Sequence, residues 1–309
     1  MDILLQQIIN GLVLGSMYAL IALGYTMVYG IIQLINFAHG EVLMVGALTA
    51  WSVIGWLQGA TPGMPTWVML LLATLAGCVV ASIVNVLIEK FAYRPLRNAP
   101  RLAPLITALG MSILLQALAM MIWKPNVKSF PSMLPTEPFF IGEAVITPTQ
   151  IMILVVTVMA LAVLTWIVNY TNIGRAMRAT AENPRVASLM GVKPGSVISA
   201  TFVIGAVLAA IAGVMYASNY GTAQHFMGFL PGLKAFTAAV FGGIGNLAGA
   251  VVGGVLLGLI EAIGSGYLGT LTGGFLGSDY TDIFAFIVLI FVLTLRPSGL
   301  LGERVADRA

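Results

Sequence analysis

The chain has 309 residues, of which 59% are hydrophobic and only 8% are charged. Soluble domains carry about 25% charged residues, and a soluble core has no room for this much apolar surface. The composition therefore indicates a membrane protein, and a formal net charge of +3 is too small to suggest a nucleic-acid partner.

Nine hydrophobic stretches are candidate spans, because a helix needs about 20 mostly apolar residues to cross a bilayer. They cover residues 4–29, 36–57, 67–88, 102–123, 150–169, 197–219, 229–245, 247–263 and 280–295. The first four and the last are the clearest, whereas the pair between 229 and 263 could include half-helices. We predict an all-α, polytopic membrane helix bundle with eight or nine transmembrane helices, forming a single domain over 1–309.

A polar cluster stands at the start of the second candidate span. Asn36, His39 and Glu41 place an amide, an imidazole and a carboxylate within six positions. Ionisable groups at membrane depth are costly and usually face a cavity or a partner. On a straight helix His39 and Glu41 point about 160° apart, so both cannot face one pore. Either the helix breaks near Gly40 and the cluster lines a substrate path, or the cluster locks a helix junction near the cytoplasmic surface.

Charge placement predicts the orientation of the chain. Eleven of the 14 basic residues fall in three segments: Lys90, Arg94, Arg97 and Arg101; Arg175, Arg178, Arg185 and Lys193; Arg296, Arg304 and Arg308. Because cytoplasmic loops are enriched in Lys and Arg, we place these segments in the cytoplasm. The proline-rich loop at 124–149 then lies outside as an ordered or extended segment. The N-terminus is also outside, and nine spans bring the C-terminus inside. Eight spans would require one segment to be re-entrant or the N-terminus to lie inside.

The longest cytoplasmic segment, 174–191, contains the signals of a short helix. Asn183 suits the N-cap, Pro184 suits the first helical position, and Gly191 suits the residue past the C-terminus. These signals predict a helix of about two turns.

One face of this short helix is apolar. Val186, Leu189 and Met190 follow the i, i+3, i+4 spacing of a single helical stripe. A groove on another protein would cover such a stripe, and so would the lipid surface if the helix lies in the interface. Both interpretations are open at this point.

Other charged residues lie in or beside the later spans. We expect Glu261 to snorkel to the interface, with a role in the path or gate as the alternative. Asp279 and Asp282 precede the last span and are expected to cap its start. Lys234 falls in or at the edge of an uncertain span, and the sequence does not place it.

Glycines recur at helical spacing in the region 245–258. Gly245, Gly249 and Gly253 are four residues apart, as are Gly254 and Gly258. Small residues at this spacing let membrane helices approach closely, either inside one chain or at an interface with another. No cluster of His and Cys suggests a metal, and no arrangement of residues suggests a hydrolase.

Several sequence blocks resemble the first permease subunit of bacterial branched-chain amino acid ABC importers. They are residues 24–32 (GYTMVYGII) with 35–41 (INFAHGE), the segment 174–191, residues 236–246 (FTAAVFGGIGN) and residues 296–302 (RPSGLLG). The resemblance spans nearly the whole chain. It is less specific for the substrate, because permeases for urea and short amides have a similar element at residues 38–41.

The resemblance implies a permease subunit of an ATP-driven importer in the cell inner membrane, surrounded by lipid. Its partners would be a second related permease subunit, two ATP-binding subunits on the cytoplasmic side and an external substrate-binding protein. The chain lacks the Gly-x-x-x-x-Gly-Lys-Ser/Thr phosphate loop, so we expect no ATP hydrolysis, catalytic residue or cofactor of its own. The candidate substrate-path residues are Asn36, His39, Glu41 and Glu261.

The segment 174–191 resembles the cytoplasmic coupling loop of that family. The residues expected to couple to the ATP-binding subunits are Arg175, Arg178, Glu182, Asn183, Pro184, Val186, Leu189, Met190 and Gly191. Two other classes remain open. One is a proton-coupled secondary transporter with a relay through His39 and Glu41, and the other is a membrane scaffold that moves nothing. The short capped helix favours the ABC class, because a secondary transporter has no ATPase to bind.

Overall fold

A computed structural model describes residues 2–96, 99–100, 102–135, 137–273, 280–296 and 298–302. Within these ranges, seven helices are long and apolar enough to cross a membrane. They are α1 (Asp2–Ile32), α2 (His39–Ala60), α3 (Thr66–Ile88), α4 (Leu102–Trp123), α5 (Pro148–Tyr170), α8 (Pro194–Tyr220) and α10 (Leu247–Leu271). The expected all-α polytopic bundle is confirmed.

Two further apolar helices are too short to cross a bilayer alone. Helix α9 (Phe229–Gly242) has 14 residues and helix α11 (Thr281–Leu295) has 15. At 1.5 Å per residue they are about 21 and 22 Å long, against a hydrocarbon core of about 30 Å. The region 229–245 thus contains the half-length helix that the sequence allowed. The last stretch, expected among the clearest spans, is also short, because its apolar run ends at Arg296.

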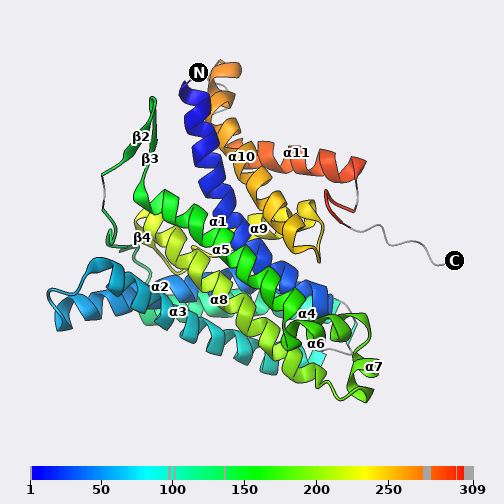
Figure 1. The fold of residues 1–309 in the computed structure, drawn as a ribbon. Helices are drawn as coiled ribbons and strands as arrows, with labels where there is room; N and C mark the ends of the chain where they lie inside the picture. The colour runs from blue at the N-terminus through cyan, green and yellow to red at the C-terminus, as the bar shows by residue number, and fades with distance from the viewer. Residues whose placement is uncertain are drawn as a thin grey trace.

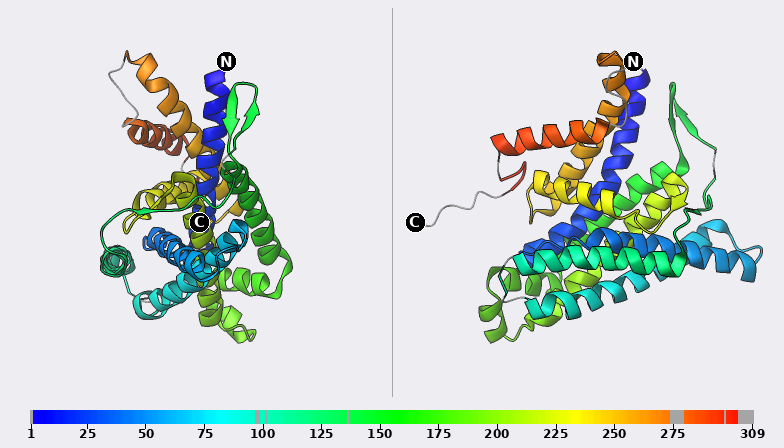
Figure 2. Two further views of the ribbon diagram at one scale, coloured as in Figure 1. Left: turned by 90° about the vertical axis from the view of Figure 1, so that its left-hand side faces the viewer. Right: turned by 180° about the vertical axis from the view of Figure 1, so that it is seen from behind.

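Helices α1, α2 and α8 form the buried centre of the bundle. Helix α1 packs most extensively against α10, and the two run side by side across the group formed by α2, α3, α4, α5 and α8 (Figures 1 and 2). Helices α3, α4 and α5 turn most of their surface outward. On α3 the outward face carries Leu71, Leu75 and Val79 at helical spacing. Such an apolar outer face is suited to contact with lipid.

Glycines allow the close approach of α1 and α10. A Cβ atom at Gly258 would lie 2.2 Å from the backbone nitrogen of Gly15, and one at Gly254 would lie 2.6 Å from that of Ala19. On the other side of α10, a Cβ at Gly253 would lie 2.1 Å from the Ala238 carbonyl oxygen of α9. These three glycines therefore serve packing inside this chain.

The loop 124–149, described except for residue 136, is partly extended, as expected. Strand β1 (Lys128–Ser129) pairs antiparallel with β4 (Thr222–Ala223), and β2 (Phe139–Ile141) pairs antiparallel with β3 (Ala144–Ile146). The Gln6 side chain of α1 bonds both backbone groups of Val145, at 2.8 and 3.1 Å. The start of α1, both strand pairs and the end of α8 thus share one end of the bundle, which the charge pattern places outside.

The opposite end carries helices α6 (Asn172–Glu182) and α7 (Pro184–Leu189) (Figure 1). Helix α3 extends to this end through a π-helical turn at Glu89–Tyr93 and a 3₁₀ turn at Arg94–Leu96. Arg94 contacts Glu89 at 3.5 Å. The described basic residues of the first two segments therefore lie at one end of the bundle, as expected if this end is cytoplasmic. They are Lys90, Arg94, Arg175, Arg178, Arg185 and Lys193.

Candidate functional site

Asn36 is the centre of a buried hydrogen-bond network between α1 and α2. Its Oδ1 accepts from the Tyr93 hydroxyl at 2.9 Å and from the backbone N–H of Ala38 at 3.1 Å. Its Nδ2 lies 3.4 Å from Oδ1 of Asn85, which donates through its own Nδ2 to the Phe202 carbonyl at 2.7 Å. The network ties the α1–α2 loop to α3, to the π-helical turn and to α8.

Glu41 is held by α4. Its Oε1 accepts from the Ser112 hydroxyl at 3.0 Å and from Nε2 of Gln116 at 2.7 Å. The residue is only 1% exposed, and its Oε2 has no hydrogen-bond partner among the residues that the structure describes. Two neutral donors therefore supply the polar environment of a carboxylate at membrane depth.

His39 lies in a tight pocket of aromatic and backbone atoms. It is fully buried, and its ring meets Tyr25 edge-on with the centroids 4.8 Å apart. A Cβ at Gly24 would lie 2.3 Å from Nε2, so the missing side chain there makes room for the imidazole. The Ile21 carbonyl lies close to the ring. Even so, neither ring nitrogen makes a well-directed hydrogen bond within the described ranges.

The expected break near Gly40 does not occur, because α2 begins at His39 and continues through Gly40. The chain turns earlier, after Gln33 with its φ of +55°, where the Asn36 side chain replaces helical hydrogen bonds. The junction itself lies toward the end that carries α6, because Asn36 bonds Tyr93 of the π-helical turn and α1 contacts α6. His39 lies deeper in the bundle, where it packs against Gly24 and Gly205. Asn36, His39 and Glu41 thus contact three different sets of neighbours, not one shared cavity.

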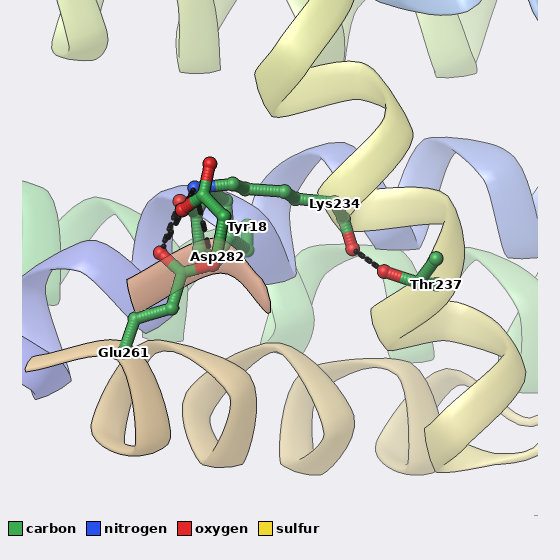
Figure 3. Close-up of polar contacts among 5 residues, drawn as sticks. All are labelled: Tyr18, Lys234, Thr237, Glu261 and Asp282. Carbon is green, nitrogen blue, oxygen red and sulfur yellow. Dashed lines mark hydrogen bonds and ion pairs between the residues drawn. The ribbon is translucent and has the colours of Figure 1, made fainter. Parts of the chain in front are cut away.

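Glu261 of α10 belongs to a second polar cluster with Tyr18 of α1, Lys234 of α9 and Asp282 of α11 (Figure 3). Tyr18 and Glu261 are buried, whereas the Asp282 side chain is 45% exposed. Its Oε2 accepts from the Tyr18 hydroxyl at 2.8 Å and from Nζ of Lys234 at 3.2 Å. Lys234 makes a shorter contact of 2.7 Å with Oδ1 of Asp282. Glu261 is 4% exposed, so the expectation that it snorkels to the interface is wrong. A lysine and a tyrosine neutralise and bond it inside the bundle instead.

Asp282 lies in the first turn of α11, near the expected place, but its carboxylate pairs with Lys234. The N-cap residue, Tyr280, makes no side-chain cap. Asp279 lies outside the described residues. Lys234, which the sequence left unplaced, is therefore the residue that joins α9 to α10 and α11.

A polar cavity of about 340 Å³ borders this cluster. Its polar lining residues are Gln7, Asn10, Gln150, Asn219, Tyr220, Glu261 and Ser265, and its apolar ones are Val13, Leu14, Met17 and Ala262. Gln150 is in the first turn of α5 and Tyr220 ends α8. The cavity therefore opens at the end of the bundle that carries the strand pairs.

Helix α7 has the ends that the sequence predicts. Asn183 Oδ1 accepts from the backbone N–H groups of Arg185 at 3.0 Å and of Val186 at 3.2 Å. Pro184 is the first helical residue, and Gly191 follows the C-cap with a φ of +85°. Capping by Asn183 and the left-handed conformation of Gly191 explain why so short a helix has definite ends.

The apolar stripe of α7 is open. Val186 is 53% exposed, Leu189 85% and Met190 81%, whereas Ala187 on another face is buried. Burying all three side chains would remove a large apolar area from water. The stripe is therefore a candidate contact surface.

Helix α6 precedes α7 and was not predicted as a helix. Thr171 caps it by accepting from the Gly174 N–H, and Met177 and Thr180 turn inward. Arg175 bonds Asn172, Arg178 bonds the Val168 carbonyl, and Glu182 is exposed. The inward spacing of 174, 177 and 180 is the signal that could have identified it.

The sequence did not single out the partners of these candidates, which are Tyr18, Asn85, Tyr93, Ser112, Gln116 and Lys234. Each lies on a different helix from the group that it bonds. A lysine and two carboxylates in neighbouring apolar stretches are nevertheless a usable signal, because buried charges are expected to pair.

Comparisons with known proteins agree over nearly the whole chain. A family described as branched-chain amino acid transport system / permease component matches residues 7–293. The high-affinity branched-chain amino acid transport system permease protein BraD of Pseudomonas aeruginosa is 47% identical, over 98% of this chain and 97% of its own length. LivH of Escherichia coli, with the same description, is 45% identical over the same shares.

More distant similarity extends to another kind of importer. The fructose import permease protein FruG of Bifidobacterium longum is 27% identical, over 85% of this chain and 76% of its own length. No solved structure matches.

Proposed function

Because the chain belongs to the family of branched-chain amino acid transport permease components, we propose that it is the permease subunit of an ATP-driven importer. The importer moves branched-chain amino acids inward across the inner membrane. Identity of 47% to BraD over nearly the full length of both chains carries this proposal. The multi-pass helical fold supplies the path through the bilayer.

Four partner subunits complete the importer. A second related permease subunit pairs with this one, two ATP-binding subunits lie on the cytoplasmic side, and a substrate-binding protein delivers the ligand from outside. The chain has no phosphate-binding loop, so ATP hydrolysis takes place on the partners.

The contact to an ATP-binding subunit is the segment 174–191. The exposed Val186, Leu189 and Met190 enter an apolar groove on that subunit, in the manner of a helix bound by its apolar face. Helix α6 transmits the movement because Met177 and Thr180 are buried against the bundle. ATP-driven closure then switches the permease pair between outward-facing and inward-facing states by rigid-body movement.

Reconstitution into proteoliposomes tests the energy source. Uptake should require ATP and the external binding protein, and it should persist when an uncoupler removes the proton gradient. The alternative relay from His39 to Glu41 gains no support from the geometry, since no hydrogen bond or ion pair between them is found in the described part. Gradient-driven uptake by this chain alone would overturn the proposal.

Competition in the same vesicles tests the substrate. Leucine, isoleucine and valine should inhibit one another, and excess urea or acetamide should not inhibit. The test is needed because related permeases serve different ligands, as the similarity to a fructose permease illustrates. Strong inhibition by acetamide with none by leucine would assign the permease to short amides and leave the ATP-driven mechanism in place.

A further inference from the structure

We infer that the outward face of α11, together with Asp282 at its edge, is the contact surface for the second permease subunit. The partner packs a membrane helix against this face and donates a hydrogen bond to the Asp282 carboxylate. The presence of a second permease rests on the proposed function, whereas the choice of this face rests on the geometry.

Asp282 lies at membrane depth. It contacts Lys234, with 2.7 Å between Oδ1 and Nζ, and Lys234 in turn contacts Glu261 at 3.2 Å. Glu261 is near the middle of the 25-residue α10, and its partner Tyr18 is near the middle of the 31-residue α1 (Figure 3). Both helices are long enough to span the bilayer, so α11 begins inside the membrane and not at either surface.

The Asp282 carboxylate can be reached from outside the chain. Its side chain is 45% exposed, whereas Lys234 is 12% and Glu261 5% exposed. Lys234 bonds Oδ1, and Oδ2 has no hydrogen bond to any residue that the structure describes. Lipid tails offer no donor, so an exposed carboxylate at this depth is costly and is expected to face a partner or a cavity. Because Lys234 already balances two carboxylates, a positively charged donor on the partner fits best.

The start and the length of α11 also argue against lipid around it. The helix has 15 residues and is about 22 Å long, against a hydrocarbon core of about 30 Å. Its N-cap residue, Tyr280, makes no side-chain cap. The first N–H groups of a helix have no acceptor within the helix, and lipid supplies none. Contact with another protein subunit satisfies these groups at lower cost.

The outward face of α11 is apolar next to Asp282. Ile283, Ile287, Ile290 and Phe291 share one side of the helix and are 55%, 59%, 61% and 65% exposed. Helices α3, α4 and α5 also turn apolar faces outward, but their sequences contain no charged residue. Those three faces suit lipid, whereas an apolar face with an accessible carboxylate suits a protein partner.

The surface is held in place before any partner binds. Helix α11 lies at the edge of the molecule, packed on α10 and α9 (Figures 1 and 2). Lys234 of α9 holds Asp282 at its start. Beyond its end, the N–H groups of Leu300 and Leu301 donate to the last two carbonyls of α9, both at 2.9 Å. A fixed surface loses little conformational freedom on binding, which favours a stable interface.

A photo-crosslinker on α11 tests the contact while the polar cluster stays intact. p-Benzoylphenylalanine replaces Ile287 in the full complex in membranes, and in a matched control it replaces Ile113, which is 67% exposed on α4. Mass spectrometry after illumination identifies the adducts. We expect adducts with the second permease at 287 and about tenfold less protein adduct at 113, because a specific interface holds its partner in place and fluid lipid does not.

Asp282→Asn tests the carboxylate. The amide keeps an oxygen that can accept from Lys234, but it loses the charge that the partner's donor meets. Dissociation of the purified complex on dilution in detergent should then occur at about tenfold higher concentration, as seen by mass photometry. Asp282→Glu should keep most of the affinity. Glu143→Gln, which changes an exposed carboxylate in the β2–β3 turn, should leave dissociation unchanged.

Each remaining outcome contradicts part of the inference. Equal protein adducts at 287 and 113, or lipid adducts alone at 287, would overturn the surface. An adduct with a second copy of this chain, or with the substrate-binding protein, would overturn the choice of partner. Unchanged dissociation in Asp282→Asn would remove the carboxylate from the contact. Leucine uptake by a complex without the adduct would overturn the inference and leave the proposed function. The adduct in a complex that transports no branched-chain amino acid would do the reverse.

Discussion

Asn36, His39 and Glu41 show what a short polar motif does when the chain folds around it. The three side chains lie within six positions, yet they contact α3, α1 and α4 respectively. Buried polar groups without partners are costly, so each position must match a partner elsewhere in the chain. The dense contacts of Asn36 favour a structural role at the junction.

Asn36→Ala tests that role. The change removes the hydrogen-bond partner of Oδ1 of Asn85 and of the Tyr93 hydroxyl, at a cost of about 1–3 kcal/mol for each lost bond to a buried group. Thermal unfolding of the purified complex should shift to lower temperature, while Gln58→Ala at an exposed position should not shift it. Loss of uptake with unchanged unfolding would instead place Asn36 in the substrate path.

At the scale of elements, local capping signals define α7, and the packing of the rest of the chain leaves its apolar stripe exposed. The ends of the helix are defined by Asn183, Pro184 and Gly191, and the helix packs on the bundle through the face that carries the buried Ala187. Three large apolar side chains are left outward, and nothing in the described part of the chain covers them. Under the proposed function, an ATP-binding partner subunit covers these side chains.

Leu189→Asp tests the contact. A charge introduced into an apolar groove loses its hydration, so the cost is several kcal/mol and uptake should fall by roughly tenfold or more. Ser188→Asp is the matched control, because Ser188 is exposed on the opposite side of the helix. ATP-dependent uptake and ATP hydrolysis are both measured. Equal uptake by the two variants would remove the contact from the coupling mechanism.

The close packing of α1 against α10 is the second feature at the scale of elements. In Gly258→Val the new side chain would overlap the Gly15 backbone, and the helices would have to separate. The amount of folded protein recovered from membranes should drop sharply. Gly110→Val on α4 should be tolerated, because a Cβ there meets nothing within 4 Å. If both variants are recovered alike, the close glycine contact does not matter for stability.

At the scale of the whole molecule, the two ends of the helix bundle carry different features. The strand pairs and the polar cavity share one end, and α6, α7 and Arg94 share the other. The half-length helices α9 and α11 lie between them against α10. Which end faces the cytoplasm follows from the basic residues.

Labelling with a membrane-impermeant thiol reagent tests this orientation. In a background with Cys78→Ala, Glu143→Cys should react from outside in intact cells. Arg178→Cys should react only after the membrane is opened. Both positions are accessible, since Glu143 is exposed in the β2–β3 turn and Arg178 lies on α6. External labelling at 178 would invert the topology and remove α7 from the cytoplasm.

The sequence by itself determined the class, the long helices, the short capped helix and the family, because hydrophobic length, charge asymmetry and capping are local properties. Only the tertiary structure decided which helices hold Asn36, His39 and Glu41, that Glu261 pairs with Lys234 and that a polar cavity opens beside it. These features depend on contacts between helices far apart in the chain, such as Tyr18 with Glu261. The spacing of residues along one helix does not predict which side chain of another helix will contact them.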